Sequence, residues 1–516
     1  MNKTTVSRWV TSVSLQAPSL QNNTADAERL INELRSALQT DQVKMDLALL
    51  RCLPQRLRQY ENQVDCILFK DRHEYILIDI KATGGNQPVV GLAVDLGTSR
   101  VVLRLMALTS AQILAESAFD KPQIAIGPDI LTRVHHADTD TGAVQLHRLI
   151  MDGLNDRINS MCRVAGISPD TIYAVSLAGN TAMTHLFLGL NPRWMIREPY
   201  IPVVNSPGVV SAGALGLAIH PAARVFIFPN VGSYFGGDLI AGILYAGLHR
   251  AEAPALLLDV GTNAEVVLGD KNWLIACAGA AGPALEGGVT RMGMMAGPGV
   301  IDRVAIQANT GEFEIRTIDD APARGICGSG LIDLAAQLFL AGFLDIRGKL
   351  VPDRCGKRLK EKDEMQYLVV VPADASATGE DLTISQADFD SLVRSKAAMY
   401  TILRTLSGTV GIELDSLATV YVAGTFGSFI NPASAVTIGM LPDLPLNHYR
   451  SLGNSSLGGA TRMLTSDCIA EIDQIRDRVT YLELNVNQEF MNRFSAAKFL
   501  PHTDRSRFPS VRRHGE

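Results

Sequence analysis

AVDLGTS at 93–99 and LLDVGTN at 257–263 share one order of residue types: two apolar residues, aspartate, an apolar residue, glycine, threonine and a polar residue. Each stretch lies between two apolar runs, so each is expected to be a turn between two strands. One such turn is ordinary, because glycine and aspartate serve many hairpins. Two copies at a domain-scale distance predict a duplicated fold whose halves face each other across a cleft.

The residue types in these turns suit phosphate binding. Glycine lets the backbone approach a phosphate closely, and successive backbone N–H groups form a concavity for anions. The expected nucleotide-binding residues of the two turns are Gly97, Thr98, Ser99, Gly261, Thr262 and Asn263. The carboxylates of Asp95 and Asp259 would repel the nucleotide unless a divalent cation lay between them. They therefore imply Mg²⁺, held largely through water as that ion prefers.

Together with AGTFGSF at 423–429, the two turns resemble the phosphate and adenosine motifs of the actin, heat-shock chaperone and sugar kinase superfamily. The resemblance implies an α/β, duplicated actin-like (ribonuclease H-like) ATPase fold with a small N-terminal α+β domain. Gly424 and Gly427 would line the adenosine site. Asp95 and Asp259 would act with the metal in catalysis.

A narrower resemblance is to the reductive activators of corrinoid enzymes. The stretches that carry it are GLAVDLGTS, LAGNTAMTHLFLGL, LLDVGTNAEVVLG, AGPALEGG, GICGSGLIDL, VYVAGTFG and GNSSLGGA, in this order between about 90 and 465. The family uses ATP to drive reduction of a cobalt(II) corrinoid to cobalt(I), so the resemblance implies a corrinoid protein as partner. The N-terminal unit, with SLQNNTADAERL, resembles the middle domain of those activators.

The sequence departs from the family pattern in its cysteines and at three turn positions. The seven cysteines stand singly, without the spacing of an iron–sulfur or zinc site. No bound cluster is therefore expected, and a separate low-potential protein must donate the electrons. Ala264 and Thr425 stand where the family usually has glycine, and Arg100 replaces a threonine.

Composition narrows the class of protein. Hydrophobic residues make up 47% and charged residues 19%, which is typical of a packed globular chain, and the net charge of −6 gives no general attraction to nucleic acid or anionic membranes. The N-terminus lacks the apolar core of a signal peptide, and no apolar run is long enough to span a bilayer. Unpaired cysteines suit a reducing compartment, so the expected location is the cytoplasm.

The chain divides into domains where its residue composition and predicted elements change. Residues 1–82 are expected to form the small α+β domain, with a hairpin from VDCILF (64–69) and EYILIDI (74–80) and a helix interrupted at Pro54. Residues 83–88 form a Gly/Pro-rich linker, residues 89–500 the two-lobed ATPase domain and residues 501–516 a flexible tail.

Several single residues have two interpretations. Asp238, at the start of a helix, either orients the attacking water or caps the helix. In GICGSG (325–330), Gly328 and Gly330 either lend N–H groups to a phosphate or allow close helix packing. Cys327 in the same loop is expected to be a buried thiol, and His185 an interior histidine rather than a cobalt ligand.

Two other functions stay open. A small-molecule kinase of the same fold needs a base beside the γ-phosphate, and Asp238 could serve. A nucleotide-gated assembly protein would need a polymer-forming or peptide-binding extension, and none is evident. The oligomeric state is also open, with a homodimer as one expectation.

Overall fold

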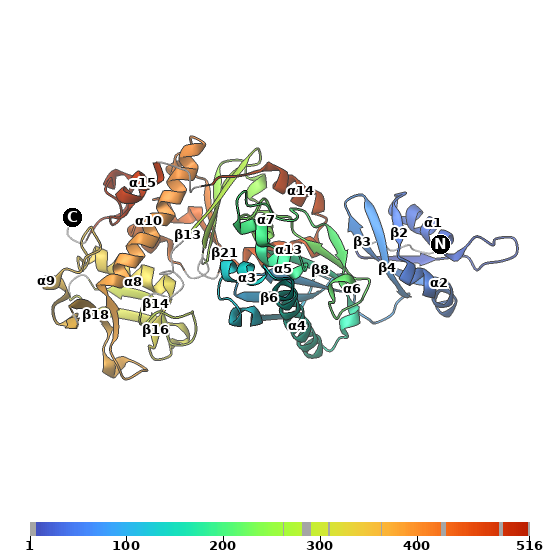
Figure 1. Ribbon diagram of the computed structural model, residues 1–516, viewed down its shortest axis with the longest axis horizontal. Coiled ribbons are helices and arrows are strands. Elements are labelled where there is room, and N and C mark those ends of the chain that lie inside the picture. Colours follow the sequence, from blue (N-terminus) through green and yellow to red (C-terminus); the bar gives the residue numbers. More distant parts are fainter. Residues whose placement is uncertain are drawn as a thin grey trace. The chain divides into compact units, whose positions relative to one another are not determined.

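The computed structural model describes residues 7–261, 263–280, 290–307, 310–362, 364–424, 430–483 and 489–513. The chain forms two compact units. Unit 1 combines residues 1–245 with residues 456–477, and unit 2 combines residues 246–455 with residues 478–516. The chain therefore leaves unit 1, builds most of unit 2, and returns (Figure 1).

The first domain of unit 1 has a four-stranded sheet covered by two helices. Its elements are β1 (Val10–Ser14), α1 (Asp26–Leu38), β2 (Val43–Met45), α2 (Leu47–Gln59), β3 (Gln63–Asp71) and β4 (Glu74–Ala82), with the strand order β1-β3-β4-β2. The pair β3 and β4 is antiparallel, which confirms the predicted hairpin. Leu30 and Leu34 of α1 and Leu53 of α2 fill the core beneath the helices.

The expected interruption at Pro54 is wrong, because α2 continues through this residue. Proline removes one helical hydrogen bond and leaves the carbonyl four residues earlier without its usual donor. Pro54 and Leu50 both lie on the exposed face of α2, where that carbonyl can face water, while Leu49, Leu53 and Leu57 are buried on the other face. Burial of that face outweighs the lost bond.

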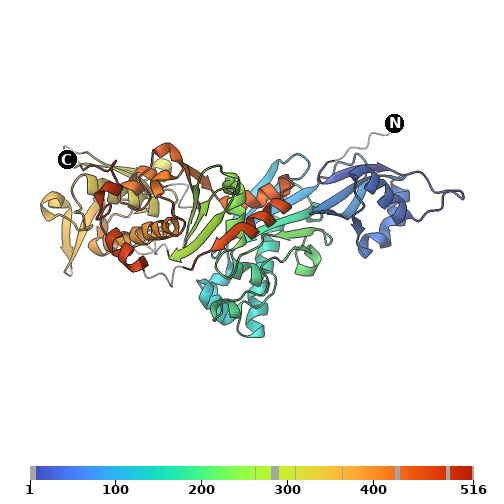
Figure 2. The ribbon, with the colours of Figure 1, turned by 90° about the horizontal axis from the view of Figure 1, so that it is seen from above.

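The rest of unit 1 is a six-stranded sheet with helices packed on it. Its elements are β5 (Val90–Leu96), β6 (Arg100–Ala107), β7 (Ile113–Asp120), α3 (Ile130–His136), α4 (Asp140–Ala165), β8 (Ile172–Gly179), α5 (Thr181–Phe187), β9 (Val209–Ser211), α6 (Ala212–Leu215), β10 (Arg224–Ile227), α7 (Gly237–Ala246), α13 (Ser455–Thr465) and α14 (Ile469–Arg478), with the strand order β7-β6-β5-β8-β10-β9. The late helices α13 and α14, drawn in red, lie among elements drawn in blue to green (Figure 1, Figure 2). A Cβ on Gly459 of α13 would lie 2.1 Å from the carbonyl oxygen of Ala241 in α7, so the two helices touch backbone to backbone.

Unit 2 repeats this sheet and adds two small ones. Its elements are β11 (Ala255–Val260), β12 (Asn263–Gly269), β13 (Leu274–Ala280), β14 (Val300–Ile306), β15 (Phe313–Thr317), β16 (Gly325–Ile326), α8 (Gly328–Leu340), α9 (Pro352–Cys355), β17 (Leu359–Lys362), β18 (Met365–Val371), β19 (Leu382–Ser385), α10 (Gln386–Thr409), β20 (Thr419–Ala423), α12 (Pro432–Thr437), β21 (Tyr449–Gly453), β22 (Val479–Tyr481) and α15 (Glu489–Ala497). The main sheet has the order β21-β20-β11-β12-β13-β22.

The two main sheets share one topology. In unit 1, β5 pairs antiparallel with β6 and parallel with β8; in unit 2, β11 pairs antiparallel with β12 and parallel with β20. The series β7-β6-β5-β8-β10 and β13-β12-β11-β20-β21 are thus equivalent. The two similar turns of the sequence therefore belong to a duplicated fold, as predicted.

The segment from Pro501 differs from the expected mobile tail. Phe508 is 2% exposed and packs on Tyr400 of α10, with the two rings 5.3 Å apart. Lys396 of the same helix donates to the carbonyls of Phe499 and Pro501 at 2.5 and 2.6 Å. The apolar residues among the arginines give this segment a place in the core of unit 2 up to residue 513.

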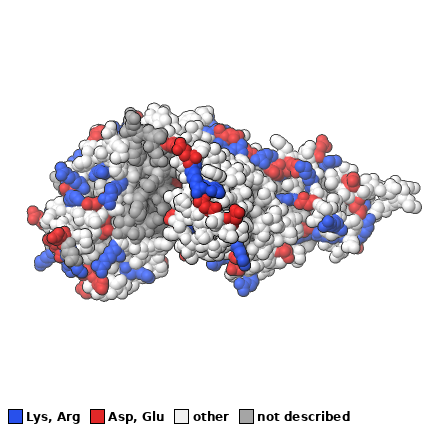
Figure 3. All heavy atoms as spheres, in the orientation of Figure 1, with Lys and Arg blue, Asp and Glu red and all other residues white. Residues whose placement is uncertain are grey.

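Figure 3 shows basic and acidic side chains interspersed over the described surface of the face in view. None of the helices in the described parts of the chain combines the length and apolar character needed to span a bilayer.

Candidate nucleotide site

The first acidic turn joins β5 to β6 in unit 1. Asp95 is half-buried near the end of β5, in register with Val102 of β6 and Ala178 of β8. A Cβ on Gly97 would lie 2.9 Å from the carbonyl oxygen of Arg100, so the turn is too tight for a larger residue. Thr98 and Ser99 follow at its partly open tip.

Side chains from distant segments hold this turn in place. Ser456 Oγ donates to Asp95 Oδ1 at 2.8 Å, and Asn180 Nδ2 donates to Thr98 Oγ1 at 3.0 Å. The buried guanidinium of Arg133 donates to the Thr98 carbonyl. Asn180 also caps α5, where its Oδ1 accepts from Met183 N. The turn is thus fixed on both its carboxylate and its threonine.

Asp238 lies beside the same turn. It is half-buried in the first turn of α7, and its Oδ1 accepts from Leu239 N at 3.0 Å. A Cβ on Gly236 would lie 2.4 Å from Asp238 Oδ1 and 2.5 Å from the Cα of Asn180, whose side chain bonds Thr98. Within unit 1 the structure therefore brings the predicted residues Asp95, Thr98 and Asp238 around one site.

The second acidic turn has an equivalent place in unit 2. Asp259 is half-buried near the end of β11, in register with Glu265 of β12 and Ala423 of β20. Gly424 has a φ of +84°, and a Cβ there would lie 2.8 Å from Asp259 Oδ1. The glycine that opens the predicted adenosine turn therefore lies directly against the carboxylate of the second acidic turn.

Part of the predicted site falls outside the described residues. Thr262, Thr425 and Gly427 lie there, as do AGPALEGG and the side chain of Asn263. Gly261 is described and partly exposed, next to Asp259. Ala264 is buried, whereas Glu265 on the opposite face of β12 is half-exposed.

Packing accounts for the glycine at 330. A Cβ on Gly330 would lie 2.2 Å from the carbonyl oxygen of Ile301, so α8 packs directly on the backbone of β14. Gly328 is the first residue of α8 and is buried with it. Cys327 is 5% exposed, with Sγ 3.3 Å from the Ile301 carbonyl, and is the buried thiol that was expected.

His185 is an interior histidine, as predicted. Its Nδ1 donates to the Thr181 carbonyl at 2.7 Å, and its Nε2 accepts from Val203 N at 3.0 Å. Burial lowers its pKa from the usual value, which favours the neutral ring that this pattern requires. With both nitrogens engaged by the backbone, the ring has no nitrogen to offer a metal.

The cysteines are engaged in packing. Six of the seven are buried, and burial raises the pKa of Cys277 to about 12 and that of Cys355 to about 11. In the part of the chain that the structure describes, no three His, Cys, Asp or Glu side chains cluster as metal ligands would.

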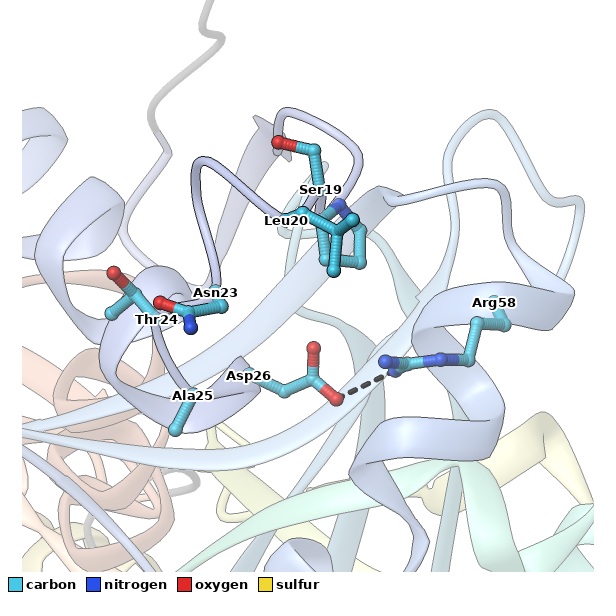
Figure 4. A pocket seen from close by; sticks show the side chains of 8 residues that line it. Ser19, Leu20, Asn23, Thr24, Ala25, Asp26 and Arg58 are labelled. Carbon is cyan, nitrogen blue, oxygen red and sulfur yellow. Dashed lines mark hydrogen bonds and ion pairs between the residues drawn. The ribbon is translucent and has the colours of Figure 1, made fainter.

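An open pocket lies away from both turns, in the first domain. It is lined by Pro18, Ser19, Leu20, Asn23, Thr24, Ala25, Asp26 and Arg58. Asp26 Oδ2 is 2.6 Å from Arg58 Nη1 (Figure 4). Its Oδ1 accepts from Arg29. These ion pairs occupy the one carboxylate of the pocket.

Sequence reasoning missed four residues that surround the first turn: Lys121, Arg133, Asn180 and Ser456. Asn180 and Ser456 belong to GNTAMTH and GNSSLGGA, two stretches that were noted for family resemblance, so that resemblance was the available signal. Lys121 and Arg133 carried no signal, since a buried cation has the same letter as a surface one.

Three consecutive regions of the chain match the regions of one known protein family. Residues 8–86 match the family region described as "RACo linker region", residues 90–251 the "RACo middle region" and residues 253–512 the "C-terminal domain of RACo the ASKHA domain". The likeness of residues 1–82 to a middle domain is thereby corrected, because that segment corresponds to the linker region.

Two curated relatives and one solved structure resemble most of the chain. It is 32% identical over 422 residues to the "Corrinoid activation enzyme RamQ" of Eubacterium limosum, covering 79% of this chain and 70% of that protein. It is 23% identical over 438 residues to the "[Co(II) methylated amine-specific corrinoid protein] reductase" of Methanosarcina barkeri, covering 78% of this chain and 75% of that one. The solved structure, "Reductive activator for corrinoid,iron-sulfur protein", is 37% identical with a TM-score of 0.88, covering 99% of this chain and 82% of that one. The chain therefore belongs to the RACo family, with the linker, middle and actin-like ASKHA regions of that family in sequence.

Proposed function

We propose that the protein is an ATP-dependent reductive activator that binds a corrinoid protein and promotes reduction of its cobalt(II) to cobalt(I). The relatives named for corrinoid activation and corrinoid protein reduction support this function. The observation that carries the nucleotide part is the pair of equivalent acidic turns, each at the end of the first strand of a duplicated sheet.

The residues of unit 1 fit a phosphate–metal site. Asp95 offers a half-buried carboxylate oriented by Ser456, and Thr98 is held by Asn180. Oxygen donors of this kind suit Mg²⁺, which when bound would neutralise the charge on the phosphates. Asp95 and Asp259 would hold the ion through water, Gly97 would let the backbone approach a phosphate, and Asp238 would orient the attacking water.

ATP hydrolysis must act here by changing conformation. A ligand shifts an equilibrium only through its different affinities for the two states. Closure around ATP would favour the form of the protein that alters cobalt coordination in the bound partner. The single electron for each cobalt would come from a separate low-potential donor protein, since the buried thiols are poor cluster ligands.

The deciding experiment is anaerobic reduction of a candidate corrinoid protein by a low-potential donor, followed through the cobalt(I) absorbance. Cobalt(I) should accumulate with Mg-ATP and not with Mg-ADP. Asp95→Asn and Asp259→Asn should each abolish both ATP hydrolysis and cobalt(I) formation in a folded protein, because each removes a metal-site charge at nearly constant size. Unchanged turnover in both variants would show that the acidic turns are misassigned.

The same assay distinguishes the activator from the alternative function, a small-molecule kinase in which Asp238 would be the base. Hydrolysis that rises on addition of the inactive corrinoid protein supports an activator. Phosphate transfer to a small hydroxyl compound, with no response to corrinoid proteins, would favour a kinase.

A further inference from the structure

Lys121 lies against the first acidic turn, although it follows β7 in the sequence. Its backbone N–H donates to the carbonyl of Ser99 at 2.8 Å, and its side chain is 2% exposed. Burial and the positive charge of Arg133 lower the pKa of the Lys121 ammonium group, and the negative charge of Asp95 raises it. Lys121 is therefore anchored to the turn through its backbone, with its side chain inside the protein.

This ammonium group lacks the partners that a buried charge requires. Among the residues that the structure describes, no acceptor lies within hydrogen-bond distance of Lys121 Nζ. An ammonium has three N–H donors, and burying them without acceptors is costly. Burial and the nearby Arg133 both lower the pKa of Lys121, whereas Asp95 alone raises it.

Lys396 shows what a structural buried lysine looks like in the same chain. It is 0% exposed, but its Nζ donates to the carbonyls of Phe499 and Pro501. Its position is thus explained by contacts within unit 2. Lys121 has no such explanation, although it too is almost completely buried.

Arg133 holds the backbone of the same turn in place. Its Nε donates to the Gly127 carbonyl at 2.7 Å, its Nη1 donates to the Thr98 carbonyl, and it is fully buried. Arg133 thus fixes the backbone of the turn, while Lys121 Nζ stays without an acceptor among the described residues. The missing acceptors must be several and strong, because an ammonium has three donors. Phosphate oxygens have these properties, and ammonium groups are common phosphate ligands.

We propose that Lys121 binds the phosphate chain of the nucleotide at the first acidic turn, and that Arg133 is the positioning residue that holds Thr98 for the same ligand. This inference rests on the proposed nucleotide site, but not on the corrinoid partner.

The test compares the wild-type full chain with Lys121→Met and Lys396→Met. Thermal unfolding of each protein alone and calorimetric titration with Mg-ATP, Mg-ADP and adenosine are measured. Lys121→Met should keep or raise the midpoint of unfolding, because it replaces an unpartnered buried charge with an apolar chain of similar length. It should weaken Mg-ATP and Mg-ADP binding about 10- to 100-fold and leave adenosine binding unchanged.

Lys396→Met should do the opposite, with a lower unfolding midpoint and unchanged nucleotide affinities. If Lys121→Met unfolds more easily, or fails to fold, while wild-type protein binds Mg-ATP, Lys121 is a structural partner of Asp95 and the proposal is wrong. Equal Mg-ATP affinity in wild type and Lys121→Met would also overturn it.

The two proposals fail in different ways. Wild-type protein that binds Mg-ATP through Lys121 but activates no corrinoid protein would leave the lysine assignment standing and remove the activator function. Wild-type protein that binds no Mg-ATP would overturn the nucleotide site and the role of Lys121 together.

Discussion

Ser456 donates a 2.8 Å hydrogen bond to Oδ1 of Asp95, although 361 residues separate them in the sequence. The bond joins the first strand of the unit 1 sheet to a helix that enters the unit near the end of the chain. A carboxylate oriented in this way presents its other lone pairs in a fixed direction. Partners of this kind tune metal ligands without touching the metal.

Removing the Ser456 hydroxyl should therefore change the metal requirement of the protein. Ser456→Ala is expected to raise the Mg²⁺ concentration needed for half-maximal ATP hydrolysis about tenfold, with a smaller effect at saturating Mg²⁺. Ser455→Ala is the matched control, since its buried Oγ has no hydrogen-bond partner among the described residues. Identical magnesium curves for both variants would contradict the orienting role.

Measurements of hydrolysis rate and stability can distinguish the two possible roles of Asp238. Asp238→Ala should slow ATP hydrolysis more than it weakens Mg-ATP binding if the carboxylate orients the attacking water. If the residue acts only at the start of α7, the change should instead lower the free energy of unfolding by about 1 kcal/mol, with near-normal hydrolysis. Single-turnover hydrolysis and urea unfolding of the same variant distinguish these results.

Buried hydrogen bonds and more exposed ion pairs both join the first domain to the rest of unit 1. Trp9 Nε1 donates to the Leu464 carbonyl at 2.9 Å, and Trp9 is 3% exposed; Arg72 and Asp473 pair at 2.7 Å with Arg72 largely in solvent. Trp9→Ala should cost about 3–5 kcal/mol, and Arg72→Ala within about 1 kcal/mol.

Neither variant should alter Mg-ATP affinity, because both acidic turns lie outside this domain. A chain starting near Gln87 should also bind Mg-ATP, with a lower unfolding midpoint because α13 loses the cover of Trp9. We expect the first domain to be required for docking on the corrinoid partner, so the shortened chain should not activate that partner. Activation at the full rate would rule out this docking role.

His502 makes unit 2 sensitive to acid. Burial and the neighbouring cations Lys396 and Arg507 lower the pKa of His502 to about 4, and its Nδ1 accepts from Asp504 N at 2.9 Å. The unfolded chain takes up this proton near pH 6.5, whereas the folded protein resists it until about pH 4. This contribution to stability is complete above pH 6.5 and is lost as the pH falls towards 4.

His502→Gln keeps an acceptor for Asp504 N without a titrating ring. It should flatten the fall in unfolding midpoint between pH 6.5 and pH 4, while His73→Gln, at an exposed position, should leave the wild-type slope. A slope unchanged in His502→Gln would mean that other groups dominate acid unfolding.

The sequence was most informative where local patterns repeat. Apolar strands on both sides of Asp95 and Asp259 predicted two equivalent sheets. The expected interruption at Pro54 was wrong because local helix propensity does not include the free energy gained by burying the apolar face of α2. The arginines after Pro501 suggested a solvated tail because the places of Phe508 and Val511 depend on α10 and its neighbours, far away in sequence.

The candidate site was predicted only in part, for a related reason. Asp95, Thr98 and Asp238 belong to turns and helix starts that can be recognised locally. Ser456, Asn180, Arg133 and Lys121 reach the turn from other segments, and only the folded chain shows which lysine has lost both water and partners.

The return of residues 456–477 to unit 1 also sets the order in which the protein can be made. On the ribosome, the sheet around Asp95 emerges long before α13, and at about 5–20 residues per second the wait between Tyr245 and Asp477 lasts on the order of tens of seconds. During this time α7 lacks the helix that packs on Ala241, and Asp95 lacks the Ser456 hydroxyl. Shorter nascent chains thus lack part of the packing on α7, and only a polypeptide synthesised as far as α13 acquires the finished acidic turn.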